Sequence, residues 1–225
     1  MNKETVLKLE SVSYRYKDAA KDEYVLKDIN YQFEKGKIYA IKGKSGSGKT
    51  TLLSLISGLE KKYEGNILYK DKELAKMNLD NYRSKDVGIV FQSYNLLPQL
   101  TAIENIILSM DVGKLKVKDK KGLALNLMEQ VGLDKSLSKR RILKLSGGEQ
   151  QRVAIARSLS YNPEIILADE PTGNLDKETE NEILDIFTNL AHKQNKCVII
   201  VTHSSNVCDR ADKIYELKKV NESMK

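Results

Sequence analysis

Several residue types and sequence features are scarce in this chain of 225 residues. The two cysteines, Cys197 and Cys208, are too few to build a disulfide framework. Three prolines and 13 glycines exclude a collagen-like chain and do not suggest wholesale disorder. No apolar run approaches the ~18–20 residues of a membrane-spanning helix, and the start lacks the apolar segment of a signal peptide. We therefore expect a folded protein of a reducing compartment that neither is secreted nor crosses a membrane unaided.

Arginine is also scarce, although the formal net charge is +7. Such a charge permits nucleic acid, an anionic membrane surface or a phosphorylated substrate as partner. Only 7 of the 38 basic residues are arginine, whose bidentate side chain is typical of proteins that read DNA bases directly. We therefore expect no nucleic-acid partner. Most of the excess charge lies in residues 111–144, which contain ten basic and four acidic residues. A solvated face is the cautious interpretation of that segment.

Hydrophobic periodicity predicts strands at both ends of the chain and helices in the middle. A capping-box pattern, Thr101 with Glu104, opens a region over residues 101–160 that we expect to be mostly helical. Strands alternate with a helix again further on, and the helix is expected over residues 177–191. This order predicts an α/β nucleotide-binding core with a helical insertion. The expected strands are 6–14, 25–33, 37–41, 66–69, 87–91, 165–168, 197–201 and 214–217.

Residues 43–50, with the sequence GKSGSGKT, fit the phosphate-loop pattern G-x-x-x-x-G-K-[ST] in full. The pattern follows an expected strand and precedes an apolar helix, as a loop that cradles phosphates requires. A plain Gly/Ser turn is the alternative, and a dinucleotide fingerprint fails because Thr51 stands at the third glycine position. We expect Lys49 to contact the β- and γ-phosphates and Thr50 to bind Mg²⁺. The residues expected to bind nucleotide here are Gly43, Lys44, Ser45, Gly46, Ser47, Gly48, Lys49, Thr50 and Thr51.

Two carboxylates, Asp169 and Glu170, follow an apolar run that is typical of a strand buried on both faces. Ligands of α/β sheets bind at the carboxyl ends of the strands. We therefore expect Asp169 to hold Mg²⁺ and Glu170 to orient or deprotonate the attacking water. An acidic loop after a buried strand is the alternative, but the phosphate loop in the same chain favours the catalytic interpretation.

Three further features have both a structural and a functional interpretation. Ser146 and Glu149 form the S-x-x-E pattern of an ordinary helix start, but Gly147 and Gly148 between them would let a phosphate approach the helix N-terminus. Gln92 and His203 each follow an expected strand. Either side chain alone would be taken for a polar residue at a strand end; together they point to the edge of the sheet that carries Glu170.

In this order, the motifs resemble those of the ATP-binding subunit of ABC transporters, over essentially the whole chain. The resemblance implies that Gln92 senses the γ-phosphate and contacts Mg²⁺, that His203 bridges the γ-phosphate and the catalytic water, and that Glu170 is catalytic. It implies that Tyr16 stacks on adenine, although two-residue alternation leaves Tyr14 as an alternative.

The family's fold and assembly give further expectations. These are one domain over residues 1–225, with a nucleotide-binding core at 1–91 and 160–225 and a helical subdomain at 92–159. The core would combine a mixed sheet, flanking helices and an N-terminal antiparallel β subdomain. Two subunits would close on ATP head to tail, and the residues acting across the dimer interface would be Ser146, Gly147, Gly148, Glu149 and Asp176. Glu149 stands where the family consensus has Gln, and Ser204 follows His203 where Asp is common.

Residues 91–105 resemble the subfamily that serves macrolide exporters, lipoprotein-release systems and antimicrobial-peptide resistance transporters. The resemblance implies a peripheral ATPase at the cytoplasmic face of the cell membrane, with ATP and Mg²⁺ as cofactors. Its partner would be a permease with few transmembrane helices and a large extracytoplasmic domain, with a membrane-fusion or adaptor protein as a further candidate partner. The basic segment 111–144 would then dock near the anionic inner leaflet.

Three other ATPase or GTPase classes fit less well. A chromosome-maintenance or DNA-repair ATPase head needs a long coiled coil, but the 53 residues between Gln92 and Ser146 lack sustained heptads. Translation-factor ATPases of this type carry two cassettes in one chain. A GTPase would carry the guanine-reading pattern Asn-Lys-x-Asp, which is missing.

Overall fold

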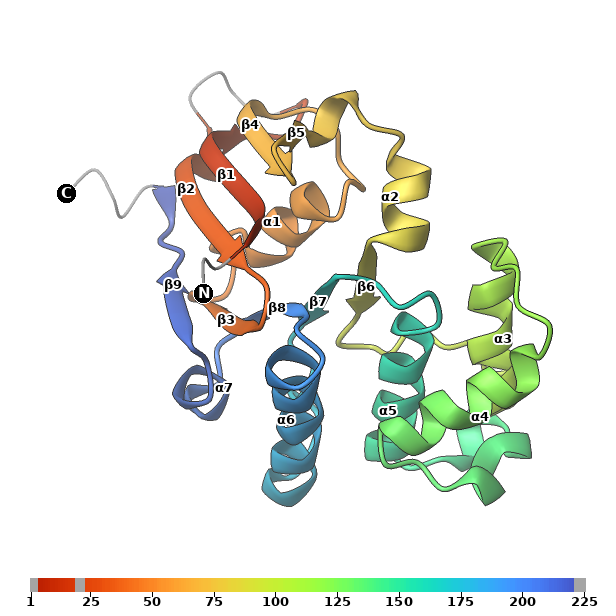
Figure 1. Cartoon of the computed structure of the whole chain (residues 1–225). Helices are drawn as coiled ribbons and strands as arrows, with labels where there is room; N and C mark the ends of the chain where they lie inside the picture. Colours follow the sequence, from red (N-terminus) through yellow and green to blue (C-terminus); the bar gives the residue numbers. More distant parts are fainter. Residues whose placement is uncertain (1–3, 19–22, 221–225) are drawn as a thin grey trace.

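Five parallel strands form the sheet on which the molecule is built (Figure 1). The structure is a computed structural model that describes residues 4–18 and 23–220, so the ends of the domain expected over 1–225 lie partly outside it. Each strand pairs in parallel with its neighbour, which places all the carboxyl ends at one edge. In spatial order the strands are β6 (Val87–Val90), β7 (Ile165–Asp169), β8 (Cys197–Thr202), β3 (Lys37–Lys42) and β9 (Lys213–Glu216).

The central strands are buried on both faces, and their side chains alternate between two hydrophobic cores. Ile165, Leu167 and Ile199 pack with helix α1 (Lys49–Ile56). The intervening Ile166 and Val198 pack with helix α6 (Lys177–His192). This double burial explains why these strands read as continuous apolar runs. The short helix α7 (Ser205–Asp209) then connects β8 to β9.

The antiparallel strands lie in a second sheet, in the order β2-β1-β4-β5, beside α1 (Figure 1). The expected α/β fold with its separate N-terminal antiparallel β subdomain is confirmed, and among the described residues the core sheet is parallel throughout where a mixed core sheet was expected. The core strands can all be parallel because every link between successive core strands, such as the one through α6 between β7 and β8, is a crossover that contains a helix. The strands are β1 (Thr5–Tyr14), β2 (Leu26–Glu34), β4 (Glu64–Tyr69) and β5 (Lys72–Glu73).

Three helices between β6 and β7 pack on one another, away from the antiparallel sheet (Figure 1). The capping box of Thr101 and Glu104 is formed at the start of α3. Apolar residues of all three helices join the core that also holds α6, so the insertion is continuous with the sheet's hydrophobic packing. The helices are α3 (Ala102–Val112), α4 (Lys120–Gln130) and α5 (Gly147–Ser158), with 3₁₀ turns η2 (Lys135–Lys139) and η3 (Ile142–Lys144).

Two short helices, α7 and α2 (Leu79–Lys85), were not predicted, and α2 follows the 3₁₀ turn η1 (Leu74–Lys76). The side chain of Asn78 caps α2 by accepting a hydrogen bond from the backbone N–H of Asn81. Its seven residues bury only Leu79 and Tyr82. A helix this short presents too few turns for apolar periodicity to reveal it.

Candidate functional site

The phosphate loop connects the end of β3 to the start of α1 at the carboxyl edge of the parallel sheet. Gly46 and Gly48 have φ values of 74° and 93°, in the left-handed region that glycine adopts without a steric penalty. A Cβ atom on Gly43 would lie 2.4 Å from Ser47 Oγ and 2.6 Å from the carbonyl oxygen of Leu217. The chain therefore closes tightly on itself here and leads directly into the N-terminus of α1.

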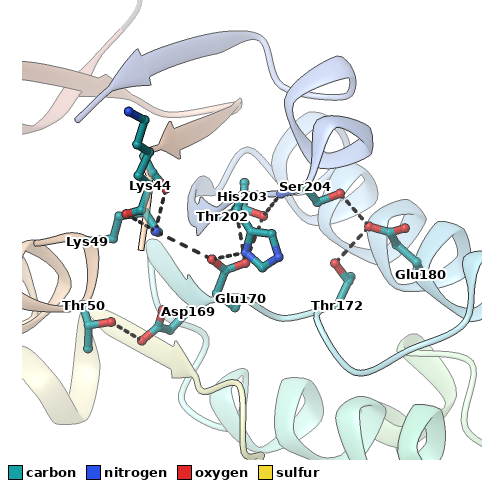
Figure 2. A network of polar contacts seen from close by, with 11 residues as sticks. Lys44, Lys49, Thr50, Asp169, Glu170, Thr172, Glu180, Thr202, His203 and Ser204 are labelled. Carbon is teal, nitrogen blue, oxygen red and sulfur yellow. Dashed lines mark hydrogen bonds and ion pairs between the residues drawn. The ribbon is translucent and has the colours of Figure 1, made fainter. Parts of the chain in front are cut away.

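The ammonium group of Lys49 is held across this loop. Its Nζ donates hydrogen bonds to the carbonyl oxygens of Gly43, at 2.7 Å, and Lys44, at 3.2 Å. The same Nζ lies 4.0 Å from Oε1 of Glu170 (Figure 2). The loop cation and the acidic end of β7, far apart in the sequence, are thus adjacent in the fold.

Thr50 and Asp169 form a pair of oxygen ligands beside the loop. The Thr50 hydroxyl donates to Asp169 Oδ2 at 3.1 Å. Burial raises the pKa of the Asp169 carboxyl, while the Thr50 hydrogen bond and Lys49 act in the opposite direction. A desolvated carboxylate next to a hydroxyl suits Mg²⁺, which takes few protein ligands and completes its shell with phosphate oxygens and water. In the part of the chain that is described, no group of three or more His, Cys, Asp or Glu residues could hold a metal without such help.

Glu170 is held in a strained conformation by its neighbours. Its φ of 44° lies in the left-handed region, which costs a residue with a Cβ about 1–2 kcal/mol. Its Oε2 accepts from the Thr202 hydroxyl at 3.2 Å and from the His203 backbone N–H at 3.3 Å. Its Oε1 lies 2.8 Å from His203 Nδ1. Because an ionised carboxylate only accepts, Nδ1 is the donor in that state. β8 therefore aims the carboxylate toward Lys49 (Figure 2).

A polar network extends from this carboxylate to the first turn of α6. The backbone N–H of Ser204 donates to Thr202 Oγ1 at 2.9 Å. The hydroxyls of Ser204 and Thr172 donate to Oε1 of Glu180 at 2.9 Å and 3.1 Å (Figure 2). Sequence reasoning assigned no role to Thr172, Thr202, Ser204 or Glu180. The signal available was Ser204, which departs from the family's common Asp after His203.

The two candidate tyrosines have opposite environments. Tyr16 is 55% exposed, and its hydroxyl lies 3.1 Å from Thr51 Oγ1, directly after the phosphate loop. Tyr14 is only 7% exposed and packs edge-on against Tyr16, with ring centroids 5.3 Å apart. An exposed ring beside the loop can stack on a base, whereas a core ring cannot. The structure therefore favours Tyr16 over Tyr14 for this position.

Gln92 lies just beyond β6 and is exposed to solvent. A Cβ atom added to Gly173 would lie 3.4 Å from Gln92 Nε2 and 3.9 Å from the Cβ of Glu170. The end of β6 and the turn after β7 therefore meet at Gly173, as expected for neighbouring parallel strands. This places Gln92 at the edge that carries Glu170.

The remaining predicted residues gather where α5 meets α6. Ser146 caps α5 in a capping box with Glu149, and Asp176 caps α6 by accepting from Thr179. Those hydrogen bonds hold the pKa of the exposed Asp176 carboxyl below its usual value. A Cβ atom on Gly148 would lie 2.5 Å from Cγ2 of Thr179. Glycine at 148 thus serves close helix packing within this chain, a role that sequence reasoning missed.

A glycine-rich loop between a parallel strand and a helix, a Thr–Asp pair beside it and a glutamate aimed by histidine define a phosphate-loop nucleotide hydrolase. The chain belongs to the ABC transporter family, whose family model matches residues 26–173. It is accordingly the ATP-binding cassette of an ABC transporter, and an ATPase.

Two relatives are similar over nearly their whole length. The chain is 46% identical to an uncharacterized ABC transporter ATP-binding protein, YclH of Bacillus subtilis (strain 168), over 92% of this chain and 91% of that protein. It is 42% identical to the lipoprotein-releasing system ATP-binding protein LolD of Rickettsia felis (strain ATCC VR-1525 / URRWXCal2), over 95% and 96%.

Two solved structures of the ABC transporter cassette MJ0796 resemble this fold. One is a dimer, with a TM-score of 0.84 and 37% identity over 94% of both chains. The other is a dimer in a post-hydrolysis state bound to ADP and Pi, with a TM-score of 0.86 and 35% identity over 95% of this chain and 96% of that one. No helix within residues 4–18 and 23–220 of this chain is long and apolar enough to cross a membrane.

Proposed function

We propose that this chain closes as a homodimer on ATP and that hydrolysis then powers a separate membrane permease. The permease exports its cargo or moves it by transmitting mechanical force, and the cargo is a lipoprotein, a macrolide or an antimicrobial peptide. The 42% identity to a protein named for lipoprotein release supports lipoproteins first. Residues 1–91 and 160–225 act as the nucleotide-binding core, and residues 92–159 as the helical subdomain.

The chemistry rests on residues at the carboxyl edge of the parallel sheet. The loop of residues 43–50, with Lys49 in it, binds the phosphates together with Thr51, and Tyr16, whose hydroxyl contacts Thr51, stacks on adenine. Thr50, Asp169 and Gln92 hold Mg²⁺, which supplies charge stabilisation at the phosphates. Glu170 takes a proton from the attacking water, and His203 orients Glu170.

The dimer contacts are proposed on residues beyond this edge. Ser146 and Asp176 are exposed at the start of α5 and α6, and they lie beside Gly147, Gly148 and Glu149. The N-terminus of α5, exposed at Ser146, would bind the phosphate of a partner subunit's nucleotide. The two cassette dimers with 37% and 35% identity support this assembly.

A groove between α2 and α3 is the proposed contact for the permease. Leu108 and Val112 line it, and Val112 is 74% exposed. Arg83, Lys85 and Lys114 line the same groove. An amphipathic permease segment with acidic residues complements this surface. The basic loop that follows α3 would then face the anionic inner leaflet, which places the chain peripherally at the cytoplasmic face. An adaptor protein is a further candidate partner.

One observation carries the catalytic proposal, namely the left-handed Glu170 whose carboxylate lies 4.0 Å from Lys49 and 2.8 Å from His203. Glu170→Gln keeps the size and removes the base, so we expect ATP turnover to fall on the order of 10²–10⁴-fold. ATP binding should persist, and the variant should elute as an ATP-bound dimer in size-exclusion chromatography.

Glu129→Gln is the matched control, because Glu129 is exposed on α4, outside the proposed nucleotide and dimer contacts. Its turnover should equal that of the unmodified chain. Unchanged turnover in Glu170→Gln would refute the general-base assignment, and an ATP-bound monomer would refute the proposed assembly.

A further inference from the structure

The carboxylate of Glu180 contacts the strand-end loop 202–204, which lacks the acidic residue that is common there in the family. ABC cassettes commonly carry Asp directly after the histidine, but this chain has Ser204 there. The Ser204 hydroxyl reaches across to α6 and donates to Oε1 of Glu180 at 2.9 Å. The buried Thr172, from the turn after Glu170, donates to the same oxygen at 3.1 Å (Figure 2). Glu180 thus supplies a negative charge to this loop from another element.

The contact with Ser204 is connected to Glu170 through Thr202. Ser204 N–H occupies a lone pair of Thr202 Oγ1, at 2.9 Å. The single hydrogen of that hydroxyl then points to Glu170 Oε2, at 3.2 Å. The Ser204 conformation therefore determines which way the Thr202 hydroxyl donates. The adjacent His203 contacts Glu170 through both its backbone N–H and its Nδ1.

We propose that Glu180 is a positioning residue for ATP hydrolysis, standing in for the acid that this chain lacks at position 204. It fixes Ser204, and through Ser204 the Thr202 and His203 donors that aim Glu170. The proposal rests on the catalytic role proposed for Glu170. Glu180 lies one turn after Asp176, the cap of α6, so a partner subunit that presses on this helix start would also act on the loop that orients Glu170.

The test uses steady-state ATPase kinetics of the full chain. Glu180→Ala removes the shared acceptor, and we expect kcat to fall ~10-fold or more while KM for ATP stays within about twofold, because the phosphate loop is untouched. Glu180→Gln retains an oxygen acceptor for Ser204 and Thr172 and should keep more of the turnover. Ser204→Asp alone should also lower kcat, because it sets two carboxylates against each other.

The decisive variant combines Glu180→Ala with Ser204→Asp. The new carboxylate occupies the vacated space and can accept from Thr172, so kcat should recover to within about threefold of the unmodified chain. Glu129→Ala, exposed on α4 and outside the proposed nucleotide and dimer contacts, is the control and should leave kcat unchanged. Melting temperatures of all variants separate positioning from loss of fold.

Two results would overturn the positioning role. One is a Glu180→Ala variant whose kcat stays within about twofold of normal. The other is a double variant whose melting temperature recovers while its kcat does not, because recovery of stability alone would show that the contact is purely structural. Failure of the proposed function gives a different result, because Glu170→Gln itself would then retain turnover.

Discussion

Two adjacent carboxylates at the end of β7 have different environments and therefore different tasks. Asp169 is the last residue of the strand, and burial raises the pKa of its carboxyl. Glu170 turns into the left-handed region and accepts hydrogen bonds from the end of β8. One side chain is thereby kept beside Thr50, where we propose that Mg²⁺ binds, and the other faces Lys49 and His203. The direction of each follows from a single change in backbone conformation.

Asp169→Asn is predicted to stabilise the fold while it abolishes Mg²⁺-dependent ATP hydrolysis. The folded-state pKa of Asp169 lies above the unfolded value, so ionisation costs more in the folded protein and lowers its stability at neutral pH. The amide removes that cost and can still accept from Thr50. Thermal unfolding from pH 7 down to about pH 4 checks the sign, since the stability gained should shrink as the wild-type carboxyl becomes protonated.

Asp18→Asn provides the control, because Asp18 is exposed and lies outside the site. It should change neither the melting temperature nor its pH dependence. A melting temperature for Asp169→Asn below that of the parent at pH 7 would contradict the assignment of burial as the main cause of the pKa shift.

At the scale of elements, the contact between α5 and α6 depends on one glycine. Gly148 stands in the first turn of α5, where alanine would favour the helix by about 1 kcal/mol. The methyl group of Thr179 occupies the space that an alanine side chain would need. Thr179 is itself held by two hydrogen bonds to Asp176, so it cannot easily move away.

The effect of Gly148→Ala on the free energy of unfolding is therefore predicted to have opposite signs in the native chain and in a chain that carries a second substitution at Thr179. In the native chain the Cβ would lie 2.5 Å from Thr179 Cγ2, and we expect destabilisation of ~1–3 kcal/mol. Thr179→Ser removes that methyl group and keeps the hydroxyl on Asp176. In the Thr179→Ser background, Gly148→Ala should be neutral or stabilising by up to ~1 kcal/mol.

Chemical unfolding of the native chain, the two single variants and the double variant measures this coupling. Gly147→Ala is a useful comparison, because its Cβ would lie 3.2 Å from the Tyr94 hydroxyl and not against Thr179. Its effect on the free energy of unfolding should therefore be the same with and without Thr179→Ser. Equal effects of Gly148→Ala in both backgrounds would show that the glycine is needed for something other than the contact with Thr179.

At the scale of the whole molecule, the positive charge has a defined location. Between α3 and α4, Lys114, Lys116 and Lys118 alternate with Leu115 and Val117. The three lysines are exposed, and Val117 is 39% exposed. Lys120 instead pairs with Asp111. Among residues 4–18 and 23–220 these three lysines form no ion pair, and with apolar side chains between them they give this segment the composition of a peripheral membrane contact.

Lys116, Lys118 and Lys121 changed together to Gln should weaken binding to anionic vesicles. Each lysine near such a surface contributes about 1 kcal/mol, so we expect a loss on the order of 10²-fold for three. Sedimentation with phosphatidylserine/phosphatidylcholine vesicles at low and physiological salt measures it.

Changing the exposed lysines 61 and 62, just before β4, and 72, on β5, to Gln gives a control with the same change in net charge. Equal losses in the two triple variants would reduce the effect to net charge alone. If the variant changed at Lys116, Lys118 and Lys121 binds the vesicles as well as the unmodified chain does, the basic segment is only a solvated face.

Much of the site could be predicted from the sequence because its chemistry is encoded in short neighbouring segments. The phosphate loop needs its glycines, lysine and threonine within residues 43–50, and the two carboxylates follow one apolar strand. Alternation and capping patterns likewise operate over one or two turns, so most strands and the helix α3 could be located. Helix α2 escaped because seven residues with two buried side chains carry almost no periodicity.

By itself, the sequence determined which groups can bind phosphate and in what order the elements follow. Only the tertiary structure decided that the core sheet is parallel throughout the described residues, that Tyr16 and not Tyr14 faces the loop, and that Glu180 reaches Ser204. Thr202 and Glu170 are 32 positions apart, and Thr50 and Asp169 are 119 apart. Contacts at such separations depend on which strands pair and which faces pack, and local residue patterns carry no record of that choice.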